Sequence, residues 1–166
     1  MNNTSNMKNE QPAQKESLPE INWVRPDIQS EMEEIKLVAE KMSGSEDHYN
    51  EHYQQSVREI IDAMKDARLE ELADEMWSNL KNTDSYHKVR LGHIEDAQKL
   101  AEHYNRDWRS LLDAIKNNAP MQTPIILITK DGVPHLVAGN TRLMIARALG
   151  AEVHTLIARL KEPEKS

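Results

Sequence analysis

The sequence predicts a small α+β protein, and three observations lead to that prediction. Apolar residues recur at intervals of three and four along residues 27–81, which indicates amphipathic helices. After a cluster of turn-forming residues at 82–85, short apolar runs typical of strands alternate with helical segments. Two of these runs flank the pair Asp131-Gly132, which is typical of a β-hairpin turn. We therefore expect a helical hairpin followed by a mixed sheet with packed helices.

Length and cysteine content narrow the classes of protein that remain. The 166 residues suit one domain with appendages or two small units. The chain has no Cys, which excludes disulfide bonds and thiol chemistry. No apolar run is long enough to span a bilayer, and residues 1–25 lack the apolar core of a signal peptide. We expect a cytoplasmic protein with no membrane contact.

Charge is distributed unevenly along the chain. Residues 1–84 contain nine Lys or Arg against nineteen Asp or Glu, whereas residues 85–166 contain twelve against nine. The acidic first half is an unfavourable surface for bare nucleic acid, so we do not expect direct DNA binding. The mildly basic second half suits an anionic ligand.

The first half divides into a polar tail and a helical region. Residues 1–25 are rich in Asn, Gln, Ser, Glu and Lys, a composition typical of disorder. Apolar stripes predict a helix over 27–42 and a longer helix over 46–81 with one break near Arg68. Two helices cannot form a hydrophobic core by themselves. We therefore expect residues 26–83 to pack on the second half or on a second copy, as a partner or dimer surface.

The second half, residues 84–162, is expected to carry the sheet. Asp131-Gly132 predicts the hairpin turn, and Gly150 is expected at the C-terminal end of the last helix. The expected strands are 86–94, 125–129, 135–137 and 153–160, and the expected helices are 95–104, 106–117 and 141–149.

A polar segment, Gly139-Asn140-Thr141-Arg142, lies where the second hairpin strand leads into the last helix. Gly139 permits backbone angles that other residues avoid, and Asn140 is a strong candidate for the helix N-cap. A helix start has free N–H groups and partial positive charge, so it can bind an anion. Arg142 is unfavourable for the helix dipole by itself but suits a bound phosphate. The alternative is an ordinary strand-to-helix joint with a solvated arginine.

The segment TPIILITKDGVPHLVAGNTRLMIARALGAEVHTLIARL resembles the ParB/sulfiredoxin-like domain. That family has a helix, a Pro-Ile strand, a hairpin, a strand that ends in Gly-x-x-Arg, an Ala-rich helix that ends in Leu-Gly, and a closing strand. The matching elements are SLLDAIKNNAPMQTPIILI (110–128), Gly139-x-x-Arg142 and ARALG (146–150). The resemblance covers about residues 86–160.

The resemblance implies nucleotide binding. In this family the Gly-x-x-Arg box and the adjacent helix start bind the phosphates of ATP or CTP, here expected with Mg²⁺. Arg90 lies in a region that borders the nucleotide in the family, although strand alternation also allows it to face water. The family suggests a phage or mobile-element protein with a DNA-related role. The other residues implied as phosphate contacts are Gly139, Asn140, Thr141, Arg142 and Ser110.

The chain departs from the family within the box. Asn140 stands where sulfiredoxin has its nucleophilic Cys, so sulfinic-acid reductase chemistry is excluded. Thr141 stands where ParB has a second Arg, and the box contains no general base. His135 is the candidate catalytic residue, because histidine titrates near neutral pH and this one begins the strand that leads into the box. A solvent-exposed histidine on an edge strand is the alternative.

His48 and His52 are four residues apart and would share one face of a helix, as a metal-binding pair does. A metal site needs three or four convergent ligands, so we interpret the pair as a surface or helix-packing face and expect no metal site.

Two functions of different class therefore remain open. The first is a nucleotide-binding module for ATP or CTP, with phosphoryl transfer or nucleotide hydrolysis as the reactions open to it and its status as an enzyme undecided. The second is a non-catalytic interaction module that keeps the fold and binds a protein partner through its acidic helical half. A nuclease of the ParB type would need a carboxylate cluster near the box, and the sequence has none there.

Overall fold

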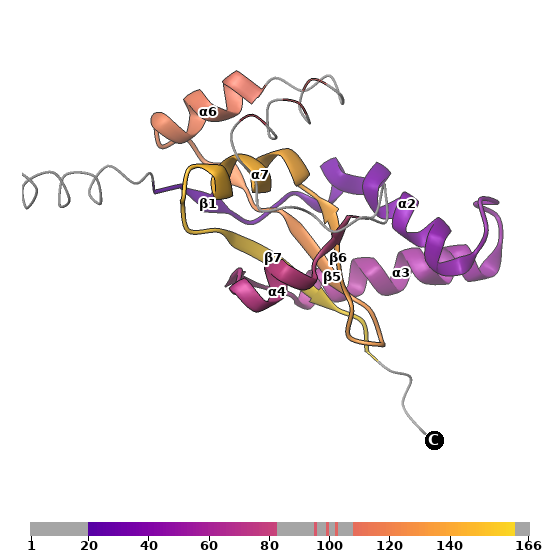
Figure 1. Ribbon diagram of the computed structural model, residues 1–166. Coiled ribbons are helices and arrows are strands. Elements are labelled where there is room, and N and C mark those ends of the chain that lie inside the picture. The colour runs from indigo at the N-terminus through magenta and orange to yellow at the C-terminus, as the bar shows by residue number, and fades with distance from the viewer. Residues whose placement is uncertain (1–19, 83–94, 96–98, 100–101, 103–107, 162–166) are drawn as a thin grey trace, which may run out of the picture.

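The computed structural model describes residues 20–82, 95, 99, 102 and 108–161 (Figure 1). The expected strand with Arg90, most of the expected helix 95–104 and the boundary between residues 83 and 84 lie outside the described residues. The described part contains helices and two β-sheets, which confirms the α+β class.

The main sheet is mixed and has the strand order β2-β7-β5-β6-β3. β5 lies at its centre, antiparallel to β6 and parallel to β7. β2 pairs antiparallel with β7, and β3 pairs parallel with β6. The bounds of the strands are β2 Arg68–Glu71, β3 Lys81–Asn82, β5 Ile125–Ile128, β6 Pro134–Ala138 and β7 His154–Arg159.

A second, two-stranded sheet joins the beginning of the described chain to the segment before β5. Strand β1 (Trp23–Val24) pairs in parallel with β4 (Met121–Gln122). The indole N–H of Trp23 also donates a hydrogen bond to the carbonyl of Glu152 at 2.9 Å. The tail predicted over residues 1–25 is therefore wrong for its last residues, because backbone pairing and an indole hydrogen bond fix them to the fold.

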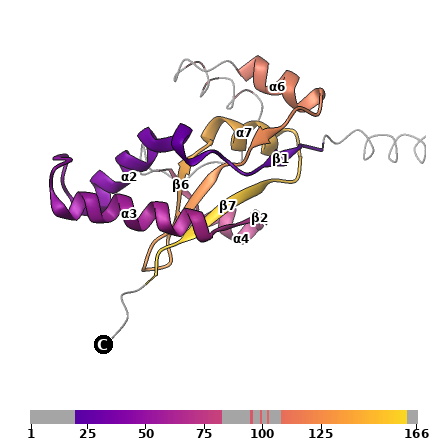
Figure 2. The ribbon, with the colours of Figure 1, turned by 180° about the vertical axis from the view of Figure 1, so that it is seen from behind.

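Helices cover both faces of the main sheet. The short 3₁₀ helix η1 leads directly into α2, and α2 and α3 form an antiparallel hairpin (Figures 1 and 2). The bounds are η1 Ile28–Glu31, α2 Met32–Ser43, α3 Glu51–Asp66, α4 Asp74–Asn79, α6 Trp108–Lys116 and α7 Asn140–Ala148.

One face of the sheet is covered by the α2–α3 hairpin. Ile35 of α2 and Ile60 of α3 are fully buried in a cluster with Ile125 and Leu127 of β5. Because side chains alternate along a strand, Ile126 of the same strand points to the other face. The α2–α3 hairpin therefore packs on the sheet of the second half of the chain, one of the two alternatives for this region.

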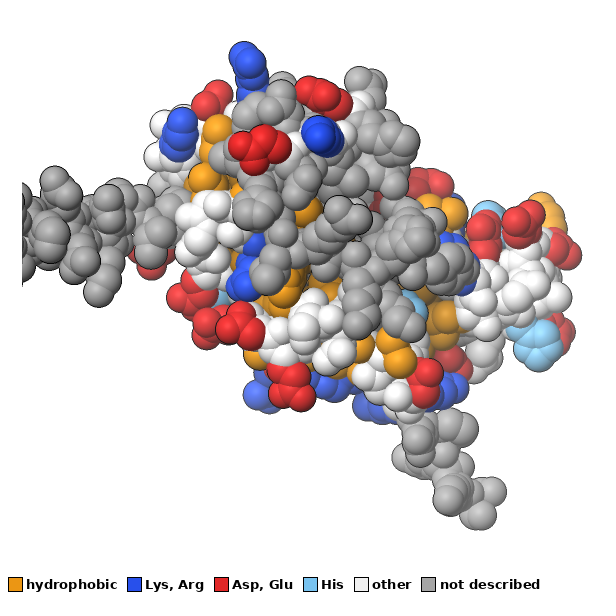
Figure 3. Space-filling model, viewed as in Figure 1, with side chains coloured by type: hydrophobic (Ala, Val, Ile, Leu, Met, Phe, Trp, Pro, Cys, Tyr) orange, Lys and Arg blue, Asp and Glu red, His pale blue; other side chains and the backbone are white. Residues whose placement is uncertain are grey.

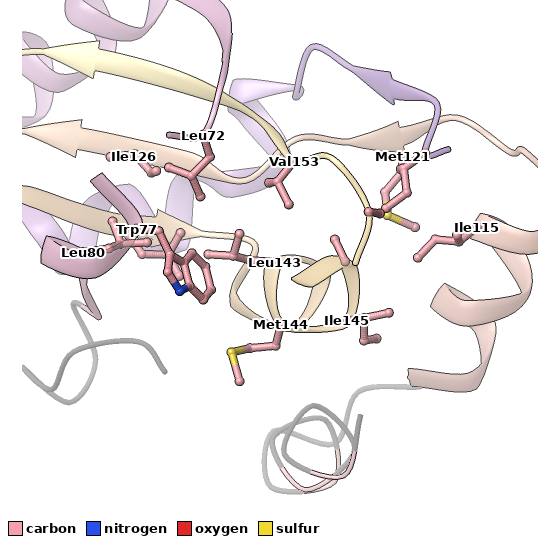
Figure 4. Packing of buried hydrophobic residues seen from close by; sticks show 14 of the residues in the cluster. Leu72, Trp77, Leu80, Ile115, Met121, Ile126, Leu143, Met144, Ile145 and Val153 are labelled. Carbon is pink, nitrogen blue, oxygen red and sulfur yellow. The ribbon is translucent and has the colours of Figure 1, made fainter. Parts of the chain in front are cut away.

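The opposite face is covered by α4, α6 and α7. Figure 4 shows Trp77, Leu143 and Ile126 converging there, with Ile115 of α6 at the edge of the cluster. The sheet is therefore buried on both faces, which explains why β5 is an uninterrupted apolar run rather than an alternating one.

The long helix expected over 46–81 is wrong in its second half. The expected break near Arg68 is in the right place, but α3 ends at Asp66 and the chain continues as β2, α4 and β3. Edge pairing with β7 supplies the backbone hydrogen bonds that a continued helix would have supplied. Just beyond β2, for example, the N–H of Leu72 donates to the carbonyl of Val153 at 2.7 Å. Tertiary pairing therefore overrides a helix-compatible sequence.

Arg25 stabilises the end of α3 from outside the helix. Its guanidinium donates hydrogen bonds to the carbonyls of Ala67 and Met64, both at 2.8 Å, and to that of Lys65 at 3.3 Å. A cation on the last carbonyls of a helix satisfies their acceptors and complements the negative end of the dipole.

The predicted hairpin and the predicted end of the last helix are confirmed. The N–H of Gly132 donates to the carbonyl of Thr129 at 2.9 Å, and Gly132 has a φ of +83°. At the end of α7, Gly150 has a φ of +72°, and its N–H donates to the carbonyl of Arg147 at 3.0 Å. Both glycines adopt the left-handed conformation that these turns require.

The surface of the described residues carries both signs of charge. Figure 3 shows acidic and basic side chains close together along the lower edge of this face rather than in separate fields. None of the described helices is long and apolar enough to cross a membrane.

Candidate functional site

The joint between β6 and α7 is built around Gly139. This residue has a φ of +92°, and a Cβ added there would lie 2.7 Å from the Cα of Pro124. The same Cβ would lie 2.9 Å from Nη2 of Arg142, so the guanidinium folds back over the start of α7. Only glycine fits both the backbone angle and the space.

Gly139, not Asn140, is the N-cap of α7. The helix begins at Asn140, and the carbonyl of Gly139 accepts the first helical hydrogen bond, from the N–H of Leu143 at 2.8 Å. The prediction of Asn140 as the cap is wrong because the close approach of Pro124 reserves the cap position for glycine. With no capping side chain, the first-turn N–H groups receive no acceptor from the cap residue.

Arg142 makes an ion pair with Glu31, a residue that the sequence analysis did not single out. Nη2 of Arg142 lies 3.3 Å from Oε1 of Glu31, and the two side chains are only 18% and 15% exposed. The alternative of a solvated arginine is therefore wrong. The guanidinium already holds an oxyanion in a place that largely excludes water.

The ion pair joins two helix starts that are far apart in the sequence. Glu31 is the N-cap of α2, with backbone angles of −109° and 14°, and Arg142 is in the first turn of α7. The contact brings the starts of these two helices together, although α2 and α7 cover opposite faces of the sheet. The first turn of α7 contains no acidic residue, whereas that of α2 contains Glu33 and Glu34. Glu31 therefore supplies the anion that the positive start of α7 lacks.

The other predicted residues of the box lie at the same joint, but they differ in how far they are exposed to solvent. Gly139 and Asn140 are half-buried, whereas Thr141 is only 4% exposed. Asn140 is therefore better placed than Thr141 for a ligand that approaches from solvent. Ser110 is exposed in the first turn of α6.

His135 is not at the box. It lies near the hairpin end of β6, four residues before Gly139, which corresponds to about 13 Å along a strand. β6 has a neighbour on each side, and His135 is paired in register with Leu127 of β5 and Lys81 of β3. The alternative of a histidine on an edge strand is therefore wrong, because His135 is a half-buried residue of an interior strand.

His48 and His52 do not form a pair on one helix face. α3 begins only at Glu51, because Asn50 caps it by accepting hydrogen bonds from the N–H groups of His52 and Tyr53. His48 precedes the cap, stacks on Tyr53 with ring centroids 4.3 Å apart, and contacts Glu40 at 2.7 Å. Its role is to pack the α2–α3 connection. Among the described residues, no group of three or more side chains is arranged to hold a metal ion.

Tyr53 lies in an acidic environment that this packing creates. Burial raises the pKa of the Tyr53 phenol, and the nearby carboxylates of Glu40 and Glu33 raise it further. The phenol therefore stays neutral and stacked at physiological pH.

Two residues of this joint, Glu31 and Pro124, could not be predicted from the sequence. Pro124 directly precedes the expected strand 125–129, but its contact with Gly139 depends on the register of β5 and β6. Glu31 and Arg142 are 111 residues apart, and no local pattern relates them.

Comparison of the chain with protein-family models, with curated proteins and with solved structures found no match. The resemblance to the ParB/sulfiredoxin-like domain therefore stays a prediction.

Proposed function

We propose that this protein binds the phosphates of a nucleotide, ATP or CTP, at the start of α7. The observation that carries the proposal is the position of the Arg142 guanidinium. It folds back onto the helix start, within 2.9 Å of where a Cβ of Gly139 would be, and holds a carboxylate 3.3 Å away. A guanidinium and first-turn N–H groups at one place suit the oxygens of an oxyanion such as phosphate.

Each residue of the box has a distinct part in this proposal. Gly139 lets the Arg142 guanidinium and Pro124 lie against the backbone at the start of α7, because a Cβ at this position would meet both of them. The N–H groups of Asn140 and Thr141 would donate to phosphate oxygens, and Arg142 would supply the charge. The sequence resemblance to the ParB/sulfiredoxin-like domain, whose box has the same Gly-x-x-Arg spacing, supports the choice of a nucleotide over inorganic phosphate.

Mg²⁺ enters this proposal with the nucleotide. Magnesium commonly binds substrate phosphates with one or two carboxylates and several waters, and a dedicated protein cage is not required. We propose no reaction, because His135 lies away from the box and the box holds no other general base.

The proposal is tested by calorimetric titration of the protein with ATP and CTP, each with and without Mg²⁺. We expect binding by the wild type and a loss of roughly tenfold to a hundredfold in affinity for Arg142→Ala, the range of a charge-assisted hydrogen bond. Arg58→Ala, on the exposed surface of α3, is the matched control and should bind like the wild type. Failure of the folded wild type to bind either nucleotide would refute the proposal. Assay of released phosphate in the same samples distinguishes binding from turnover.

A second candidate, a protein-interaction module, is favoured by a different observation. Three large hydrophobic side chains that are exposed, Leu37, Met42 and Tyr49, lie on α2 and on the connection to α3, and Tyr49 is 90% exposed. Acidic residues flank Tyr49 on both sides in the sequence. Exposed aromatic residues are frequent anchors of protein interfaces. A folded wild type that binds neither nucleotide in the titration above would favour this function, with a protein partner or a second copy on the helical region.

A further inference from the structure

Glu31 occupies the position on Arg142 that a phosphate would take. Its carboxylate comes from the opposite end of the chain and contacts Nη2 of the guanidinium at 3.3 Å. Both side chains are more than four-fifths buried, so neither charge is well solvated. Removal of one partner from such a pair leaves the other charge uncompensated, and the pair therefore opens readily only when another anion takes the place of the carboxylate.

The two helices differ in how much they depend on Glu31. α2 has two further acidic residues in its first turn, Glu33 and Glu34, which compensate the positive end of that helix. α7 has no acid of its own in its first turn. A phosphate that replaced Glu31 would therefore restore the anion at α7, while α2 would still keep two carboxylates at its start.

Release of Glu31 would act on a short and well-defined segment. Glu31 is the last residue of η1 and the N-cap of α2, where the chain changes from 3₁₀ to α-helical geometry. The body of α2 is fixed by Ile35 and Ala39, which are fully buried. Before Glu31, the residues of η1 are not buried, and Ile28 packs only partly against the core. The change would therefore be confined to η1 and the first turn of α2.

We propose that Glu31 is a built-in competitor for the phosphate site, so that ligand binding at α7 releases η1 from it. This inference rests on the proposed function, since it describes the regulation of the same site. Linkage makes the coupling reciprocal. A ligand on Arg142 loosens η1, and an interaction that holds η1 against α7 lowers the affinity for the ligand. η1 and the first turn of α2 are thereby the segment whose order depends on occupancy of the site.

The test compares Glu31→Gln with a matched control, Glu33→Gln, whose side chain is 89% exposed and pairs with Lys36 rather than with Arg142. Titration with ATP should show tighter binding by Glu31→Gln, by about fivefold or more, the lower end of typical coupling between sites. Glu33→Gln should stay near the wild type. In the wild type, ATP should also speed amide hydrogen exchange in residues 28–34 and leave residues 35–43 unchanged.

The outcomes separate this inference from the proposed function. If the wild type binds ATP but Glu31→Gln binds equally or more weakly, the competitor role is wrong and the binding function stands. If neither protein binds, both fail. Slower exchange in residues 28–34 with ATP bound would also overturn the inference. If Glu31→Gln does not fold, Glu31→Asp serves instead: its shorter side chain keeps the charge but retracts from Nη2, and it should bind ATP more tightly than the wild type.

Discussion

Gly139→Ala tests why the joint between β6 and α7 needs glycine. The backbone angle alone requires it, or the lack of room for a Cβ requires it as well. A φ of +92° costs a residue with a Cβ about 1–2 kcal/mol. The new methyl group would also lie 2.7 Å from the Cα of Pro124, a backbone atom that cannot turn aside. Overpacking of this kind costs about 1–3 kcal/mol. We therefore expect the free energy of unfolding to fall by about 2–5 kcal/mol in total.

Gly44→Ala is the matched control for this experiment. Gly44 ends α2 with a φ of +70°, but a Cβ added there would meet nothing within 4 Å. This variant has the backbone cost without the steric one, so its loss should stay at about 1–2 kcal/mol. Both substitutions restrict the unfolded chain equally, and that contribution cancels in the difference.

Urea denaturation of the two variants and the wild type measures these free energies, provided that the slope of the transition is the same for all three. Thermal melting gives a second reading, since about 1 kcal/mol corresponds to roughly 2–4 °C for a chain of this size. Equal losses for Gly139→Ala and Gly44→Ala would refute the reasoning. They would mean that Pro124 and Arg142 yield to a methyl group, and that the joint is not as rigid as we describe.

Two further substitutions test other parts of the fold. Thr123→Val should raise the free energy of unfolding by about 1 kcal/mol in urea denaturation, because the buried Thr123 hydroxyl has no hydrogen-bond partner among the described residues; a fall would contradict this. The hydrogen bond from the Thr129 hydroxyl lowers the pKa of Asp131 below its ordinary value. This carboxylate therefore contributes stability that is full above about pH 4 and is lost as pH falls through the lowered value. In thermal melting at a series of pH values, Asp131→Asn should lose less stability on acidification than Asp113→Asn, an exposed control on α6. An equal or greater loss for Asp131→Asn would contradict this role of the Asp131 carboxylate.

Elements that depend on local chemistry could be predicted from the sequence. The hairpin turn at Gly132 and the end of α7 at Gly150 both require a left-handed backbone conformation. Glycine adopts this conformation readily, so its presence at these positions predicts the two turns. The uninterrupted apolar run of β5 likewise predicts a strand wherever it is placed in the fold. These signals are complete within a few residues, so no knowledge of the tertiary structure is needed to interpret them.

Elements that depend on a distant partner could not be predicted. The segment of β2 is compatible with a helix, and only pairing with β7, more than 80 residues later, makes it a strand. The contact between Glu31 and Arg142 is of the same kind. Glu31 has the sequence context of an ordinary acid at the start of a helix, and nothing in that context relates it to an arginine 111 residues away. The Gly-x-x-Arg segment could be found in the sequence, but its contact with Glu31 could not be predicted.

The way each helix begins adds a physical reason to place a ligand at α7 rather than elsewhere. Asn50 caps α3 by accepting hydrogen bonds from two first-turn N–H groups, and Asp27 accepts one at the start of η1. These starts are satisfied by their own side chains. The starts of α2 and α4 have no side-chain cap, but each has two acidic residues in its first turn. α7 is capped by Gly139, which has no side chain to offer, and it has no acid in its first turn. The start of α7 thus has neither a side-chain cap nor an acid in its first turn, and the Arg142 guanidinium folds back over it. This combination suits an acceptor that the helix does not itself provide, as we propose.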